Sequence, residues 1–263
     1  MADFKSALRS GLRDISRAPA MALLLALPWV LGGWFMAWLT TATGQSYWLV
    51  FAAIGFPLLG PFAAVGYYDI SRRLQSEYAL DRKAVFAVIL RQSRRQLPSL
   101  CAVILVMFLF WFFLSHMIFA LFMGLSTMTN VSSSLQVYLT MNGLAMLAVG
   151  SLIGAGFACV LYMISVLALP MLLDREVDFV TAMIASFGFV QRQPVLMLGW
   201  GVCLGTATLI ALLPMFLGLL FVLPLFGHAS WHLYDLLAHD TSQASTAEAG
   251  DQTISSPTFS KVR

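Results

Sequence analysis

Two histidines near the end of the chain, His228 and His232, have a spacing that could bind a metal ion or haem. Residues four apart lie on one face of a helix, where two imidazoles can hold one metal ion or offer an axial ligand to haem iron. His116 is too far away to be a third ligand. It lies 18 residues beyond Pro98, roughly 27 Å along a helix, whereas His228 lies only about 10 Å before the charged residue Asp235.

The alternative interpretation of this pair is structural. The histidines would then hydrogen-bond at a membrane interface, with Trp231 and Tyr234 as aromatic belt residues. The three cysteines form no disulfide framework or metal motif. The chain also has no glycine-rich nucleotide loop, zinc-protease motif or serine nucleophile elbow. These observations predict a protein that is not an enzyme and has no cofactor, apart from haem or copper at the histidine pair.

A larger polar cluster is expected where three apolar segments end. Its members are Tyr67, Tyr68, Asp69, Arg72 and Arg73, then Asp174, Arg175, Glu176 and Asp178, then His228, His232 and Asp235. If three units of the chain pack around one another, these groups meet at one level. The cluster would then be either a salt-bridge lock between the units or a ligand site.

The composition defines the environment of these groups. Hydrophobic residues make up 60% of the 263 residues and charged residues only 10%, whereas about a quarter of a soluble domain is charged. Fifteen basic and 12 acidic residues are too few to cover a globule of this size in water. High apolar content and only three cysteines exclude a disordered or disulfide-stapled chain. We therefore expect an integral membrane protein.

The charged residues fall in four segments, 3–17, 69–95, 174–192 and 235–263. The three charge-free stretches between them contain 51, 78 and 42 residues. Because a transmembrane helix needs roughly 20 apolar residues, each stretch can form a hairpin of two crossings. The sequence thus predicts an all-α bundle of six helices, near 20–41, 47–69, 98–123, 140–169, 195–214 and 216–236. For the last pair, which turns near Pro214 and Gly218, a shallow re-entrant hairpin is the alternative.

Each hairpin is preceded by a short segment that ends near a proline, at Pro19, Pro98 and Pro194. Phe4, Leu8, Leu12 and Ile15 lie on one helical face of the first segment and basic residues on the other, a pattern typical of interfacial amphipathic helices. We therefore expect one membrane domain, 1–237, built from three repeat-like units, 1–73, 77–173 and 174–237. A disordered cytoplasmic tail, 238–263, would follow.

All 15 basic residues then lie on one side of the membrane. The positive-inside rule predicts that this side, with both termini, is cytoplasmic, and that its basic residues meet anionic lipid headgroups. The partners expected are the bilayer and another membrane protein complex, not nucleic acid. No Asp, Glu, Lys or Arg lies inside a predicted crossing, which argues against proton-coupled transport.

Three spaced motifs in this chain resemble a known family. They are Gly60-Pro61-Phe62-Ala63-Ala64 with Ser71-Arg72-Arg73-Leu74, Pro170-Met171-Leu172-Leu173-Asp174-Arg175 with Asp178 and Thr181-Ala182, and Gly227-His228-Ala229 with Trp231-His232-Leu233-Tyr234. Together they resemble the bacterial membrane proteins called domain of unknown function 2189, over nearly the whole chain except the tail. The family's second helix ends in Leu-Tyr-Glu, where this chain has Tyr67-Tyr68-Asp69. The resemblance implies a bacterial inner-membrane location, but no activity, catalytic residue or ligand.

Three functional hypotheses follow. The first is a non-enzymatic structural or accessory membrane component that acts through partner proteins or lipids. The second is a channel or uncoupled transporter for a small solute, suggested by the repeats and by prolines at similar places in each unit. The third is a haem- or copper-binding protein that uses His228 and His232. The solute, the partner and the oligomeric state do not follow from the sequence.

Overall fold

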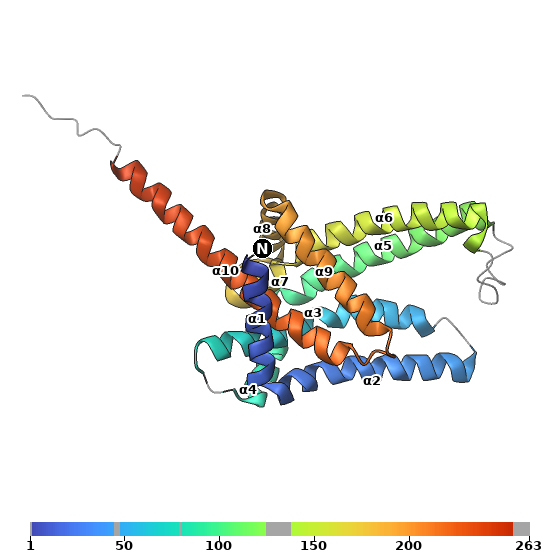
Figure 1. Cartoon of the computed structure of the whole chain (residues 1–263), viewed down its shortest axis with the longest axis horizontal. Coiled ribbons are helices and arrows are strands. Elements are labelled where there is room, and N and C mark those ends of the chain that lie inside the picture. Colours follow the sequence, from blue (N-terminus) through green and yellow to red (C-terminus); the bar gives the residue numbers. More distant parts are fainter. Residues whose placement is uncertain (1, 45–47, 79, 125–137, 255–263) are drawn as a thin grey trace, which may run out of the picture.

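The computed structural model describes residues 2–44, 48–78, 80–124 and 138–254, and within these ranges the protein is all-α with no strand (Figure 1). The helices are α1 (Ala2–Arg17), α2 (Pro19–Thr43), α3 (Trp48–Gln75), α4 (Arg82–Gln92), α5 (Leu97–Met123), α6 (Met141–Ser165), α7 (Ala168–Asp174), α8 (Phe179–Arg192), α9 (Pro194–Leu212) and α10 (Leu219–Ile254). The expected all-α fold class is therefore confirmed.

Four segments in the described part of the chain are long and apolar enough to cross a membrane. They are α2, α5, the continuous stretch of α6 and α7 (Met141–Asp174), and α9, with hydropathies between 1.8 and 2.6. At most 28% of the residues in these windows are buried within the protein. Apolar side chains that are exposed over such lengths need lipid around them, as expected for an integral membrane protein.

Prolines mark where three of these apolar helices begin. Pro19, Pro98 and Pro194 lie in the first two positions of α2, α5 and α9, where a missing N–H costs no intrahelical hydrogen bond. The shorter helices α1, α4 and α8 come immediately before them in the chain. Asp81 and Asp178 cap α4 and α8 by accepting hydrogen bonds from the backbone N–H groups of residues two and three positions later.

Small residues of α1 allow its close approach to α10, and Phe4 and Leu8 of the same helix pack against the buried core beside them. Ala7, Gly11 and Asp14 form the buried face, whereas Leu12, on the predicted apolar face, is 43% exposed. A Cβ atom on Gly11 would lie 2.9 Å from the carbonyl oxygen of Leu225, so only glycine permits this close crossing. Two residues of the predicted apolar face, Phe4 and Leu8, thus contact the core, but the closest contact with α10 is made by the adjacent small-residue face.

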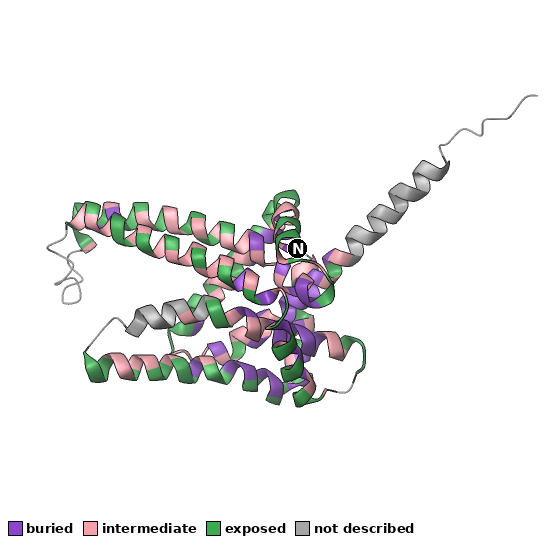
Figure 2. Ribbon diagram, turned by 180° about the vertical axis from the view of Figure 1, so that it is seen from behind, coloured by how far each residue is buried: buried purple, intermediate pink, exposed green. Residues whose placement is uncertain are grey.

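The helices α2 and α3 and the helices α5 and α6 run side by side in two elongated pairs (Figure 1). The short helices α1, α4, α7 and α8 gather at the opposite end from the connections 45–47 and 125–137. We call this end, with the C-terminal part of α3 and the middle of α10, the charged end. Buried residues concentrate there, while the far parts of α2, α5 and α6 are mostly exposed or intermediate (Figure 2).

The helices α9 and α10 are joined by a turn over 213–218, at the predicted Pro214 and Gly218. This turn lies short of the connections in the two longer pairs (Figure 1). Met215 and Phe216 have positive φ, 53° and 67°, and the turn is attached to α2 because the Trp34 indole N–H donates to the Met215 carbonyl at 2.7 Å. Beyond the turn, α10 continues to Ile254, into the stretch where the sequence predicts a disordered tail.

Candidate functional site

Buried polar side chains meet at the charged end, where α1, α3 and α10 come together. We call seven side chains there the polar core: the buried Asp14, Asp69, Ser71, His228, Trp231 and His232, and the exposed Gln75 that bonds to them. Buried polar groups are costly unless hydrogen-bonded, so their partners show whether the cluster could bind a ligand. Each contact is therefore described in turn.

The shortest contact of the polar core joins the two ends of the chain. His232 Nε2 of α10 lies 2.6 Å from Asp14 Oδ2 of α1, and these side chains are 6% and 2% exposed. Burial opposes ionisation of Asp14, but the hydrogen bond and attraction of His232, together with Ser71 and His228, outweigh it and lower the pKa of this carboxyl. Asp14 is thus a carboxylate that accepts a hydrogen bond from the imidazole.

Gln75, on the last turn of α3, determines which nitrogen of His232 carries the proton. The Trp231 indole N–H can only donate, and it donates to Gln75 Oε1 at 2.7 Å. The amide nitrogen of Gln75 must therefore face His232 Nδ1, at 3.2 Å, and Asp235 Oδ2, at 3.1 Å. In this arrangement His232 accepts at Nδ1 from Gln75 and donates from Nε2 to Asp14.

His228, one turn earlier on α10, belongs to a separate contact. Its Nδ1 lies 2.8 Å from Ser71 Oγ of α3, and its ring packs edge-on against Tyr67 with 5.3 Å between ring centroids. The Tyr67 hydroxyl donates to the Ala22 carbonyl of α2 at 3.2 Å. His228 is fully buried, and its Nε2 has no hydrogen-bond partner in the described part of the structure.

Asp69 forms the ionic part of the polar core. Its two oxygens accept hydrogen bonds from Arg72 at 2.8 Å and Arg73 at 2.6 Å, both within α3. Arg72 also lies 3.5 Å from the Leu173 carbonyl, a long contact that connects α3 with α7. A fully buried carboxylate that faces two guanidinium groups is well compensated and has little capacity left for a ligand.

Most residues of the predicted cluster lie in or beside the polar core, but Glu176 and Asp178 do not, and Glu176 is 88% exposed in an ion pair with Arg95. Asp174 accepts a hydrogen bond from Tyr234 at 2.9 Å, which joins α7 to α10. Asp178 lies apart and exposed as the cap of α8, where the Thr181 hydroxyl and backbone N–H lower the pKa of its carboxyl. Trp231 and Tyr234 are 3% and 4% exposed, so they are buried hydrogen-bond donors and not belt residues.

The predicted cluster lacks four members of the site: Asp14, Ser71, Gln75 and Trp231, the last of which was expected in an aromatic belt. One signal could have identified Asp14. It is a single acidic residue on an otherwise small-residue face, with Ala7 and Gly11 at helical spacing before it, and such a face is typical of close helix packing. Gln75 has no comparable signal, because its role depends on which residues of α10 lie opposite.

The proposed metal ligands, His228 and His232, are used differently from what their spacing suggests. Both ring nitrogens of His232 and one of His228 contact protein groups. In the described residues, no group of three or more His, Cys, Asp or Glu side chains could hold a metal ion. A metal held by both histidines would have to displace at least one hydrogen bond of His232, because among their ring nitrogens only His228 Nε2 is without a partner in the described structure.

A family model described as predicted integral membrane protein (DUF2189) matches part of the chain. Residues 49–174 match DUF2189. The DUF2189 match covers nearly all of α3 and the whole of α4, α5, α6 and α7. It therefore contains Asp69, Ser71 and Gln75 but not α1 or the histidine pair of α10. The resemblance to this family is thereby confirmed over residues 49–174. Comparison with curated proteins and with solved structures gave no match.

Proposed function

We propose that this protein is a non-enzymatic structural or accessory component of the membrane, in which the polar core joins the N-terminal helix to the C-terminal one. The observation that supports this proposal is the Asp14–His232 contact at 2.6 Å, made between α1 and α10 by two buried side chains. With Gln75, Trp231 and Asp69 also paired, these polar groups are used in holding helices together. A catalytic or ligand site would leave groups free toward a cavity.

We also propose a specific arrangement in the membrane. The helices α3 and α10 supply two crossings in addition to the four apolar segments, so that three hairpins are each preceded by an interfacial helix, α1, α4 or α8. The positive-inside rule and the 15 basic residues outside the apolar segments support a cytoplasmic charged end in a bacterial inner membrane. The prolines that begin α2, α5 and α9 support three related units.

An accessory role is tested by mild-detergent purification of the full chain from its own host. We expect it to co-purify in a fixed ratio with one membrane complex. The matched variant replaces a large apolar side chain that is exposed on α6 with a small polar one, as in Leu152→Ser. It leaves the polar core intact. A chain that purifies alone, as a fully stable monomer, would contradict the accessory role.

The second candidate, a channel or uncoupled transporter, is favoured by a cavity of about 670 Å³ between the helices. Its walls come from α2, α3, α5, α6, α7, α9 and α10, with Trp29, Phe108 and Phe226 among mainly apolar side chains and few hydroxyls. Such a lining suits a small neutral or apolar solute, not an ion. Liposomes that contain the protein and remain impermeable to a series of such solutes would exclude this function.

A further inference from the structure

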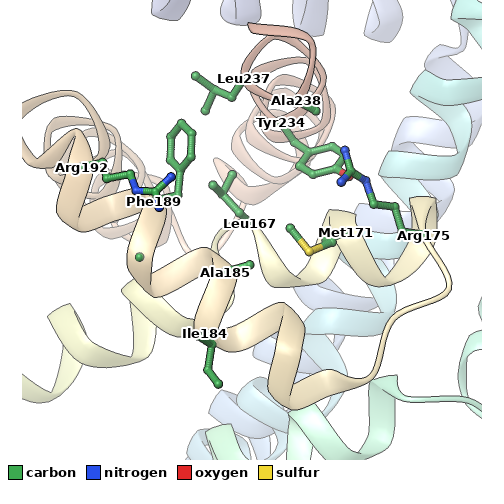
Figure 3. A pocket seen from close by; sticks show the side chains of 11 residues that line it. Leu167, Met171, Arg175, Ile184, Ala185, Phe189, Arg192, Tyr234, Leu237 and Ala238 are labelled. Atoms are coloured by element: carbon green, nitrogen blue, oxygen red, sulfur yellow. The ribbon is translucent and has the colours of Figure 1, made fainter. Parts of the chain in front are cut away.

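A second cavity, outside the polar core, lies between α7, α8 and α10 at the charged end. It has a volume of about 410 Å³, within the range of small-molecule sites. Two arginines, Arg175 and Arg192, lie on different sides of it, and Leu167, Met171 and Phe189 lie between them (Figure 3). We call it the arginine cavity.

The two arginines are available to an anion. Arg192 makes no ion pair in the described parts of the chain. Arg175 contacts Asp174 through Nε only, at 3.7 Å, and lies beside the Tyr234 ring (Figure 3). A guanidinium has five N–H donors in a planar fork that matches phosphate. The Asp174 carboxylate competes only weakly for Arg175, because their contact is long and Asp174 Oδ2 also accepts from Tyr234.

The three apolar side chains between the arginines, which we call the apolar floor, indicate what kind of anion fits. A free inorganic anion would gain nothing from Leu167, Met171 and Phe189, whereas a hydrocarbon chain that covers them would be removed from water. The cavity also lies at the charged end, beside the apolar helices that meet the lipid. A ligand with a phosphate at one end and a hydrocarbon chain at the other satisfies both the arginines and the floor.

We propose that the arginine cavity binds the phosphate group and the first methylene groups of an anionic phospholipid, with Arg175 and Arg192 on the phosphate and Phe189 against the chain. The site is separate from the polar core and does not depend on the non-enzymatic role. The group that the two arginines recognise is a phosphate monoester or diester. A soluble phosphate ester carries the same group, so the test must distinguish it from a phospholipid.

The test uses the full chain in a nonionic detergent and measures binding of short-chain phosphatidylglycerol, short-chain phosphatidylcholine and glycerol phosphate by native mass spectrometry. We expect phosphatidylglycerol to bind at least tenfold more tightly than the other two. The double substitution Arg175→Gln with Arg192→Gln should remove this preference. The matched control, Arg9→Gln with Arg13→Gln, removes the same charge from exposed positions on α1 and should retain it.

Two further measurements make the result decisive. Phe189→Ala should weaken phosphatidylglycerol several-fold and leave glycerol phosphate unchanged. If the double variant is not folded by gel filtration, Arg192→Gln alone replaces it, since this exposed side chain has no ion pair to lose among the described residues. Equal losses in the cavity and control variants would show diffuse attraction and overturn the site. Glycerol phosphate binding as tightly as the lipid would overturn the lipid assignment.

Discussion

The charged end and the α5–α6 pair are held together by different forces. At the charged end, fully buried polar side chains bond across three helices, and α1 approaches the backbone of α10 at Gly11. Along α5 and α6, only 17% and 11% of the apolar windows are buried. The contacts there are apolar, such as the tilted rings of Phe110 and Phe157, whose centroids lie 5.9 Å apart.

This difference has a physical cause. Lipid tails are as apolar as leucine, so burying apolar side chains between helices gains little over leaving them in lipid. Helix association in a membrane must then rely on close packing of small residues and on polar hydrogen bonds. The charged end has both, and we therefore expect it to contribute most of the tertiary stability of the protein.

The largest effect is expected from Asp14→Ala, which leaves His232 buried without its acceptor. A buried hydrogen bond to a charged group contributes about 1.5–3 kcal/mol, so the thermal unfolding midpoint in detergent should fall strongly. The double variant with His232→Ala should lose less than the sum of the two single losses, because the second substitution removes a group already without its partner. Additive losses would contradict a direct Asp14–His232 contact.

Gly11→Val tests the close approach of α1 to α10. The added Cβ would meet the Leu225 carbonyl oxygen at 2.9 Å and the Ala229 nitrogen at 3.0 Å, and backbone atoms cannot rotate away. Overpacking of this kind costs about 1–3 kcal/mol. Gly32→Val in α2 is the matched control, since nothing lies within 4 Å of its Cβ position, and the two variants should differ clearly in midpoint.

Trp231→Phe removes the donor that orients the Gln75 amide but keeps an aromatic ring in place. The loss of one buried hydrogen bond costs about 1 kcal/mol. The freed amide can then turn, so the ring proton of His232 should also exchange faster in a nuclear magnetic resonance measurement. An unchanged proton signal and an unchanged midpoint would show that Trp231 does not orient Gln75.

Protonation of Asp14 should weaken the charged end at low pH. The pKa of Asp14 is lowered in the folded protein from about 3.9 in an unfolded chain. Its contribution to stability is therefore complete above that unfolded value and is lost as pH falls through the lower, folded value. Unfolding midpoints measured from pH 7 to pH 3 should show this loss in the parent protein and a smaller one in Asp14→Asn. Identical profiles would contradict the linkage.

The smallest effect is expected in the α5–α6 pair. Leu152 on α6 is 76% exposed, so Leu152→Ala exchanges lipid contacts and not protein contacts. Substitutions of this kind change stability by about 0.5 kcal/mol or less. A midpoint shift as large as that of Trp231→Phe would mean that this face of α6 is covered by a partner or by a second copy of the chain.

The sequence by itself determined the all-α membrane class, the beginnings of α2, α5 and α9 at prolines, and the turn near Pro214. These features depend on local properties: the length of an apolar run, the fixed φ of proline and the spacing of charges. The resemblance to a membrane protein family could also be found this way. Most of the polar cluster could be named because its residues end predicted helices.

Only the tertiary structure decided which of these residues meet. Asp14 and His232 are 218 positions apart, and no periodicity reveals that one small-residue face of α1 lies against α10. The same holds for Gln75, whose amide is oriented by Trp231 from a different helix. Local patterns set the faces of each helix, but the choice of partner face depends on close packing and hydrogen bonds that form only when distant segments come together.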